Sequence, residues 1–193
     1  SMDESIPKEE RKYGRKNLYE MISASNVKYF KKRPLIPKSL LRKKRDCIIV
    51  GSACEQGEVY QAILDDVDED KLEEIASFYD YLEIQPDGNN MFMIRNGTLE
   101  SVEDLHAINR RIIELGKKLG KPVAATGDVH YIDQSDAYFR EILQYSQGFT
   151  DVGEERSLYY RTTQEMLDEF SYLGDELAHE VVVDAPRAIA ASI

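Results

Sequence analysis

A chain of 193 residues, 42% of them hydrophobic, is long enough for one good core and too short for two large ones. The net charge of -11 and a pI of about 4.8 exclude a general affinity for nucleic-acid phosphates, because like charges repel. The two cysteines form no CxxC motif, and we find no apolar run of membrane-spanning length and no secretory leader. We therefore expect one domain, complete or incomplete, that is cytoplasmic and has neither disulfides nor a membrane span.

Residues 1–45 predict a helical lead-in with a basic stretch. Apolar residues recur at helical spacing from Leu18 to Phe30, and Pro34 ends this pattern. Residues 39–45 predict a second, short helix. A basic run of this kind forms a solvated face, a docking surface or a nucleic-acid contact, and the sequence leaves these alternatives open. The candidate contact residues are Lys32, Arg33, Arg42, Lys43, Lys44 and Arg45.

From residue 46 onward, apolar strands alternate with amphipathic helices. Residues 47–50 predict a buried strand, and helices follow over 57–64 and 71–78. Residues 79–85 alternate as a half-buried strand does, and residues 122–125 predict a further buried strand. Between the last two strands, Ser101 to Asp104 form a capping box for a long helix that Gly120 and Pro122 end. This order predicts the α/β class, with parallel strands joined by right-handed crossovers.

Three more helices are predicted towards the C-terminus. Ser135 is placed to cap the first, and Thr162 to Glu165 form a capping box for the second. The third covers residues 176–193 and is interrupted near Pro186. The apolar side chains expected to be buried are Tyr138, Phe139, Ile142 and Leu143 in the first of these helices, and Met166, Leu167 and Phe170 in the second.

The pair Asp128 and His130 is the first candidate for chemistry. Side chains two residues apart on an extended chain point to the same side, so a carboxylate and an imidazole would converge just after the 122–125 strand. Such ligands suit Zn, Mn or Fe, which generate hydroxide for phosphate chemistry. The alternative is that an aspartate following Gly127 only forms a turn or caps a helix.

A second candidate, Cys54, follows the predicted 47–50 strand and a turn of small residues. Sites in α/β folds lie at the carboxyl ends of strands, so Cys54 could meet Asp128 and His130 there. The alternative for Cys54 is a small buried hydrophobic residue. Glu55 and Glu58 flank this turn, where the helix dipole alone would favour them.

Several motifs occur in the order found in one family. The motifs are Gly51-Ser-Ala-Cys54, Gly57-Glu-Val-Tyr60, Tyr81-Leu-Glu-Ile-Gln-Pro86, Pro122-Val-Ala-Ala-Thr-Gly-Asp-Val-His-Tyr131, Ser146-Gln-Gly148 and Arg161-Thr-Thr-Gln-Glu-Met166. With these motifs in this order, the sequence resembles the polymerase-and-histidinol-phosphatase (PHP) domain of Gram-positive PolC-type DNA polymerase III alpha subunits, from about Lys16 to the C-terminus.

The resemblance implies part of a distorted TIM-like (β/α)7 barrel that carries a metal cluster at the ends of its strands. By resemblance, Cys54 matches the ligand of the third PHP motif, and Asp128 with His130 matches the fourth. The His-x-His of the first motif and the second motif are absent, and Asn26 stands where related chains often have His. Residues 46–193 therefore resemble the half of the domain that follows the exonuclease insertion.

The resemblance also implies a function and its partners. We expect a divalent metal, Zn or Mn or else Mg, weakly held. Glu83 and Gln85 end the 79–85 strand near this site, where they either orient its ligands or take a surface or core-edge role. The parent would carry out DNA-directed DNA synthesis with 3'-5' proofreading, whereas the isolated fragment would be inactive. Its partners would be the other PHP half, the exonuclease and the polymerase core, with DNA reached through the parent and self-association at an exposed barrel edge. The alternatives are a non-catalytic scaffold and a stand-alone PHP phosphoesterase, which would need a His-rich half that this sequence lacks.

Overall fold

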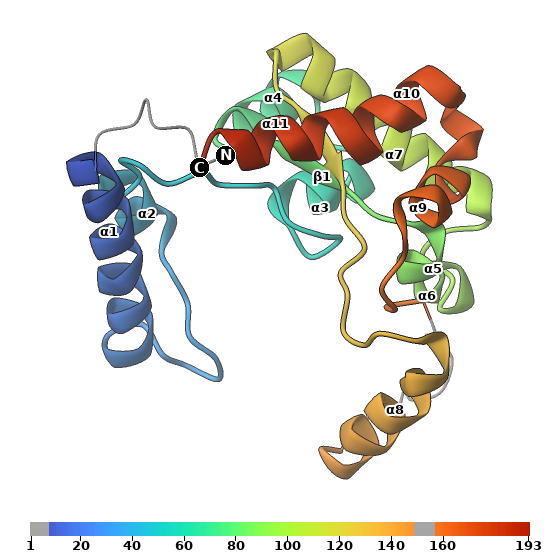
Figure 1. Cartoon of the computed structure of the whole chain (residues 1–193), viewed down its shortest axis with the longest axis horizontal. Helices are drawn as coiled ribbons and strands as arrows, with labels where there is room; N and C mark the ends of the chain where they lie inside the picture. The colour runs from blue at the N-terminus through green and yellow to red at the C-terminus, as the bar shows by residue number, and fades with distance from the viewer. Residues whose placement is uncertain (1–7, 149–156) are drawn as a thin grey trace. The chain divides into compact units, whose positions relative to one another are not determined.

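A computed structural model describes residues 8–148 and 157–193, with side chains from residue 13 onward. Residues 1–7, the start of the predicted lead-in, lie outside the described part. The chain divides into two compact units, one of Ser1–Val50 with Ala191–Ile193 and one of Gly51–Ala190 (Figure 1). The boundary lies between Val50 and Gly51, close to the end of the predicted basic lead-in.

The smaller unit contains the helices α1 (Lys8–Val27) and α2 (Lys38–Lys43), as the apolar spacing predicts. Met21 of α1 is buried, and an ion pair joins Glu20 to Lys44, which directly follows α2. Helix α1 ends three residues before Phe30, the last residue of the predicted helical pattern.

A pair of parallel strands forms the centre of the larger unit. Strand β1 (Leu82–Ile84) pairs with β2 (Val123–Ala125), with Leu82 opposite Val123 and Ile84 opposite Ala125. Helix α7 (Val102–Leu119) connects them along the chain and packs on both (Figure 1). The structure therefore confirms an α/β arrangement with parallel strands, whereas no closed barrel is present in the described residues.

Helix α7 follows its sequence prediction closely. The backbone N–H of Ser101 donates to Asp104 Oδ2 at 2.9 Å in the predicted capping box, and Gly120 ends the helix with a left-handed φ of 63°. A Cβ atom at Gly116 would lie 2.3 Å from Val123 Cγ2, so glycine allows α7 to approach β2 closely. The buried side of α7 includes Ile112 and Leu115. This helix supplies much of the core against the strands.

Short helices surround this centre. The predicted capping box at Thr162 is present, where the backbone N–H donates to Glu165 Oε2 at 2.7 Å, and it opens α9 (Thr163–Glu169). The other elements are α3 (Glu58–Leu64), α4 (Glu69–Ser77), α5 (Asp87–Asn90), α6 (Phe92–Arg95), α8 (Ala137–Ser146), α10 (Asp175–His179), α11 (Ala185–Ala191), and the 3-10 helices η1 (Gln134–Asp136) and η2 (Ser171–Leu173).

The prediction of a strand over residues 47–50 is wrong. Cys47 adopts a left-handed backbone with a φ of 60°, which breaks the extended run, and residues 48–50 form no ladder. Pairing begins only at Gly51, which forms a single parallel bridge with Tyr81. The chain still passes beside β1, but through one bridge instead of a strand.

The predicted interruption near Pro186 is present as a π-helical turn instead of a break in the helix. Helices α10 and α11 are joined by a π-helical turn, η3 (Glu180–Asp184), and the three run on without a break (Figure 1). Proline cannot donate a backbone hydrogen bond, and the wider turn just before Pro186 accommodates that missing donor. The helix therefore continues through the proline.

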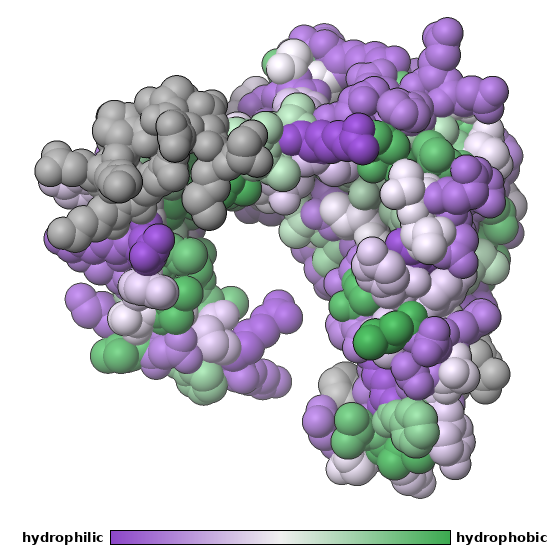
Figure 2. Space-filling view, in the orientation of Figure 1, coloured by the Kyte–Doolittle hydropathy of each residue, from purple (hydrophilic) through white to green (hydrophobic). Residues whose placement is uncertain are grey.

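The prediction that α8 buries its apolar side is wrong as well. Tyr138, Phe139, Ile142 and Leu143 are 60%, 64%, 49% and 62% exposed. Asp133 and Asp136, not Ser135, form the capping box at η1 that leads into this helix. Figure 1 shows α8 projecting away from the strands, and hydrophobic surface appears over it in Figure 2.

In the described part of the chain, no helix has the length and apolar character needed to cross a membrane.

Candidate metal centre

Three segments meet around β1. On one side, Ser52 N–H donates to the Tyr81 carbonyl at 3.2 Å, and the Glu83 N–H donates to Ser52 Oγ at 2.9 Å. On the other side, β1 pairs with β2. The turn that carries Cys54 and the loop that carries Asp128 therefore leave from the two neighbours of β1, as the sequence argument expects for the carboxyl ends of parallel strands.

Glu83 lies between these two segments. Its Oε1 accepts hydrogen bonds from Thr126 Oγ1 at 2.8 Å and from Gln85 Nε2 at 3.2 Å. Burial raises the pKa of the Glu83 carboxyl, and the charges of Asp128 and Glu55 raise it further against the lowering effect of those hydrogen bonds. These carboxylates are thus close enough to interact, and a cation among them would relieve their repulsion.

The loop after β2 holds Asp128 and His130. Asp128 has a left-handed φ of 48°, and its carbonyl oxygen lies 2.7 Å from His130 Nδ1. Its carboxylate Oδ1 lies 3.9 Å from the same ring nitrogen, and both side chains are partly open to solvent. Asp128 and His130 therefore lie close together, but through a left-handed backbone at Asp128 instead of the extended chain from which the sequence predicts their convergence.

Cys54 is half-buried in its turn. Burial raises the pKa of this thiol, and the neighbouring Glu55 adds to the effect. The protonated thiol is therefore favoured, so the thiolate form that a metal needs would have to be stabilised by the metal itself.

The predicted ligands are not gathered into a complete site. Within residues 8–148 and 157–193, no group of three or more histidine, cysteine, aspartate or glutamate side chains could hold a metal ion. The chemistry of the donor set nevertheless fits a divalent transition metal, because it offers a thiol, an imidazole and carboxylates.

Sequence reasoning missed several residues that shape this region. Ser52 is buried and joins the Cys54 turn to β1, and Thr126 donates to Glu83. Asn89 donates from its side chain to the Gly127 carbonyl at 3.1 Å, directly before Asp128. A buried polar side chain leaves no periodic signal in the sequence. Ser52 and Thr126 lie inside the Gly51–Cys54 and Pro122–Tyr131 motifs, whereas Asn89 lies in none of the motifs.

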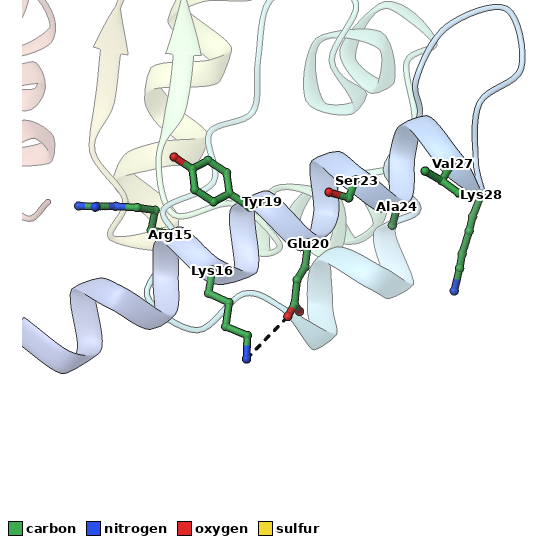
Figure 3. Close-up of a pocket in the computed structure, with 8 residues that line it drawn as sticks. All are labelled: Arg15, Lys16, Tyr19, Glu20, Ser23, Ala24, Val27 and Lys28. Carbon is green, nitrogen blue, oxygen red and sulfur yellow. Dashed lines mark ion pairs between the residues drawn. The ribbon is translucent and has the colours of Figure 1, made fainter.

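The basic stretch belongs to the smaller unit. Lys44 pairs with Glu20 instead of facing solvent alone, while Lys32, Arg33 and Lys43 are exposed. An open pocket of about 640 Å³ lies along α1, and in it Lys16 Nζ lies 3.8 Å from Glu20 Oε1 (Figure 3). Because this pocket carries both signs of charge, it does not distinguish a docking surface from a nucleic-acid contact.

Comparison with known proteins identifies the relatives of this chain. Residues 3–87 match the PHP domain family. The chain is 56% identical over 177 residues to the PolC-type DNA polymerase III of Caldanaerobacter subterraneus subsp. tengcongensis, and 48% identical over 177 residues to that of Clostridium perfringens. It is 41% identical over 183 residues to that of Bacillus subtilis. These matches cover 92% to 93% of this chain but only 12% to 13% of each relative.

The match to these polymerases runs along nearly the whole chain. The PHP match includes the motif around Cys54 and ends before the motif around Asp128. The relatives are much longer chains, so this chain corresponds to one part of a multidomain polymerase. The chain therefore belongs to the PolC-type DNA polymerase III family, as a segment that carries part of the PHP domain.

Proposed function

We propose that this chain supplies part of a PHP metal site within a PolC-type DNA polymerase III. The observation that carries the proposal is the position of Glu83 on β1, half-buried and hydrogen-bonded to Thr126 and Gln85, between the segments that lead to Cys54 and Asp128. Burial and the charges of Asp128 and Glu55 raise the pKa of its carboxyl. A carboxylate in this position is suited to a cation. Repulsion of this kind inside a fold costs free energy unless a cation or a proton offsets it.

The proposed ligands are Cys54 Sγ, an Asp128 carboxylate oxygen and His130 Nε2. Since His130 Nδ1 faces the Asp128 carbonyl, it is placed to donate there, which leaves Nε2 with the lone pair that a metal requires. Glu83 and Gln85, joined by their hydrogen bond, would orient these ligands from the strand behind them. A bound divalent metal, with Zn or Mn preferred over Mg, would activate water and neutralise phosphate oxygens.

In this proposal the site is completed by the parent chain. The two parallel strands with their crossover helix would form part of a distorted TIM-like (β/α)7 barrel, and the other PHP half would provide the remaining strands and ligands. Metal affinity depends on the number of ligands and on their preformed geometry, so the isolated chain would bind metal weakly and hydrolyse no phosphoester.

The activity of the parent is proposed from its relatives. They are named as PolC-type DNA polymerase III, which supports DNA synthesis with 3'-5' proofreading in the bacterial cytoplasm as the work of the whole chain. This segment would reach DNA only through the parent. The exposed residues Lys32, Arg33 and Lys43 would serve as docking or nucleic-acid contacts, together with Arg42, Lys44 and Arg45.

The exposed apolar face of helix α8 supports the proposal that another part of the polymerase is the partner of this segment. A ten-residue helix is too short to be stable by itself, yet its aromatic and aliphatic side chains are largely exposed. The chain represents 12% to 13% of its relatives, so the occupant we propose for this apolar face is another part of the same polymerase chain. Self-association of the isolated segment through the same face is the competing arrangement.

The second candidate function is a non-catalytic scaffold. The absence of a three-ligand cluster from the described residues favours this alternative. In a scaffold, any metal would only stabilise the fold, and removing it would lower stability without affecting any hydrolysis.

Elemental analysis of the purified chain after equilibration with Zn²⁺ or Mn²⁺ tests the metal site. We expect bound metal that is lost in both Cys54→Ala and His130→Ala. Cys47→Ala is the matched control, because Cys47 is also a free cysteine but lies in the smaller unit. Equal metal content in all four proteins would contradict the proposed ligands.

A further inference from the structure

Arg161 is a buried cation that the proposed metal site does not use. Its side chain is 3% exposed, and its Nε donates to Glu169 Oε1 at 3.2 Å. Nη1 donates to the Ser157 carbonyl at 2.6 Å and Nη2 to Ser157 Oγ at 2.9 Å. The guanidinium also lies over the ring of Tyr159, 4.2 Å from its centroid. A buried charge is tolerated only when it is paired in this way, so the guanidinium fixes Ser157.

A chain of hydrogen bonds continues from Ser157 to the Asp128 loop. Ser157 Oγ accepts from Arg161 and donates to Asn89 Oδ1 at 3.0 Å. Asn89 Nδ2 then donates to the carbonyl of Gly127 at 3.1 Å. Asn89 is 7% exposed, so a missing partner would leave buried polar atoms unsatisfied. The side chains of Ser157 and Asn89 therefore link the Arg161 guanidinium to Gly127, the residue before Asp128.

The backbone makes a second connection between the same segments. The His130 N–H donates to the Leu158 carbonyl at 2.8 Å, and the Tyr160 N–H donates to the Tyr131 carbonyl at 3.0 Å. Tyr131 and Tyr159 form a parallel bridge, and the Leu158 N–H donates to the Tyr131 hydroxyl at 3.2 Å. The segment 157–161 thus holds both ends of the loop that contains Asp128 and His130.

We propose that Arg161, Ser157 and Asn89 are positioning residues for the Asp128–His130 loop. They hold the left-handed backbone at Asp128 and the His130 ring in a fixed relation, so that both ligands are presented before metal arrives. Without this support the loop, whose side chains are partly exposed, would have to be ordered by the metal at the expense of affinity. The inference rests on the proposed metal site for its functional meaning.

Hydrogen–deuterium exchange of the whole 193-residue chain without metal tests the positioning directly. The amides of His130 and Tyr131 both donate to the Leu158 carbonyl and report on the loop. In Asn89→Leu we expect them to exchange faster, on the order of tenfold or more. Ser157→Ala, a smaller change that preserves packing, should show the same effect to a lesser degree. Tyr172→Phe is the matched control, because it also removes one hydrogen bond between side chains, the 2.8 Å bond from Asn109 Nδ2 to the Tyr172 hydroxyl, and preserves the ring.

Cobalt titration of the same proteins, followed by the visible spectrum, supplies the second readout. We expect Co²⁺ affinity to fall about 10- to 100-fold in Asn89→Leu, while Tyr172→Phe keeps the wild-type affinity. Unchanged loop exchange in Asn89→Leu, or equal acceleration in Asn89→Leu and Tyr172→Phe, would overturn the positioning role. If the loop loosens as expected but the wild type binds no Co²⁺, positioning stands and the proposed metal site fails.

Discussion

Helices α7 and α8 are both amphipathic, yet the apolar face of α7 is buried and that of α8 is exposed. In α7, Ile112 and Leu115 are 1% and 3% exposed against the strands. In α8, Phe139 and Leu143 are 64% and 62% exposed, and Ala137 is the buried residue of the helix. An apolar stripe therefore shows that a helix has a face to bury, but not that the partner belongs to the same stretch of chain.

The two helices differ in where their packing partners lie along the sequence. Helix α7 connects two paired strands, so its partners lie immediately before and after it in sequence. Helix α8 follows the Asp128 loop and contacts mainly η1. We infer that α7 is complete within this chain and that α8 is completed by the rest of the polymerase.

The largest expected difference is the presence or absence of a cross-link. A photoreactive residue placed at Phe139 of the full-length polymerase should join to a peptide from outside this segment, because α8 is covered there. The same residue at Glu114, on the exposed side of α7, should give little product. Mass spectrometry of the digested protein identifies the partner peptide. Cross-links between two copies would show that self-association covers α8 instead.

Truncating one apolar side chain in each helix should lower the free energy of unfolding by amounts that differ by several kcal/mol. Ile112→Ala leaves a cavity against the strands and should lower the free energy of unfolding by about 2–5 kcal/mol. Leu143→Ala removes an exposed side chain and should change it by less than about 0.5 kcal/mol in this chain. Urea unfolding of both variants measures the difference, and similar losses would mean that α8 is already packed.

Alkaline pH should lower the free energy of unfolding through Tyr172, which accepts a hydrogen bond from α7. Burial raises the pKa of Tyr172 to about 12, and Asn109 of α7 donates to its hydroxyl at 2.8 Å. Because the folded pKa is above the ordinary value of 10, the stabilisation is complete below pH 10 and is lost as pH rises towards 12. The loss should be on the order of 1–2 kcal/mol, since part of the ring reaches solvent.

Denaturant unfolding between pH 9 and pH 11.5 measures this loss, and absorbance at 295 nm follows tyrosine ionisation. Tyr172→Phe should show a shallower decline over the same range. The same slope in the variant and the wild type would assign the loss to other groups.

Capping should give the smallest effect. Asp104→Ala removes the acceptor of the Ser101 N–H at the start of α7 and should cost about 1 kcal/mol. Ser135→Ala, at the residue expected from sequence to cap α8, should cost almost nothing because Asp133 and Asp136 form that capping box. Thermal unfolding of the two variants compares them, and a larger loss in Ser135→Ala would contradict the observed cap.

Local signals explain why parts of the fold could be predicted. The capping boxes at Ser101 and Thr162 and the αL glycine Gly120 act within a few residues, so sequence alone located both helices. The prediction of a 47–50 strand failed because its apolar residues suit a strand, whereas the chain turns there: the Ile48 N–H donates to the Arg45 carbonyl at 3.0 Å and Cys47 is left-handed. The position of Asp128 and His130 just after a strand could be predicted from the sequence. The left-handed backbone at Asp128 could not, nor could the hydrogen bonds from Arg161 and Asn89, which join segments far apart in sequence.

The central claim is that this segment contributes metal ligands to the polymerase, and metal content of the full-length parent tests it most directly. We expect His130→Ala to lower the number of bound metal ions per molecule, while the control His179→Ala, an exposed histidine paired with Asp184, keeps the wild-type number. An unchanged metal content in His130→Ala would contradict the claim and leave the segment as a scaffold.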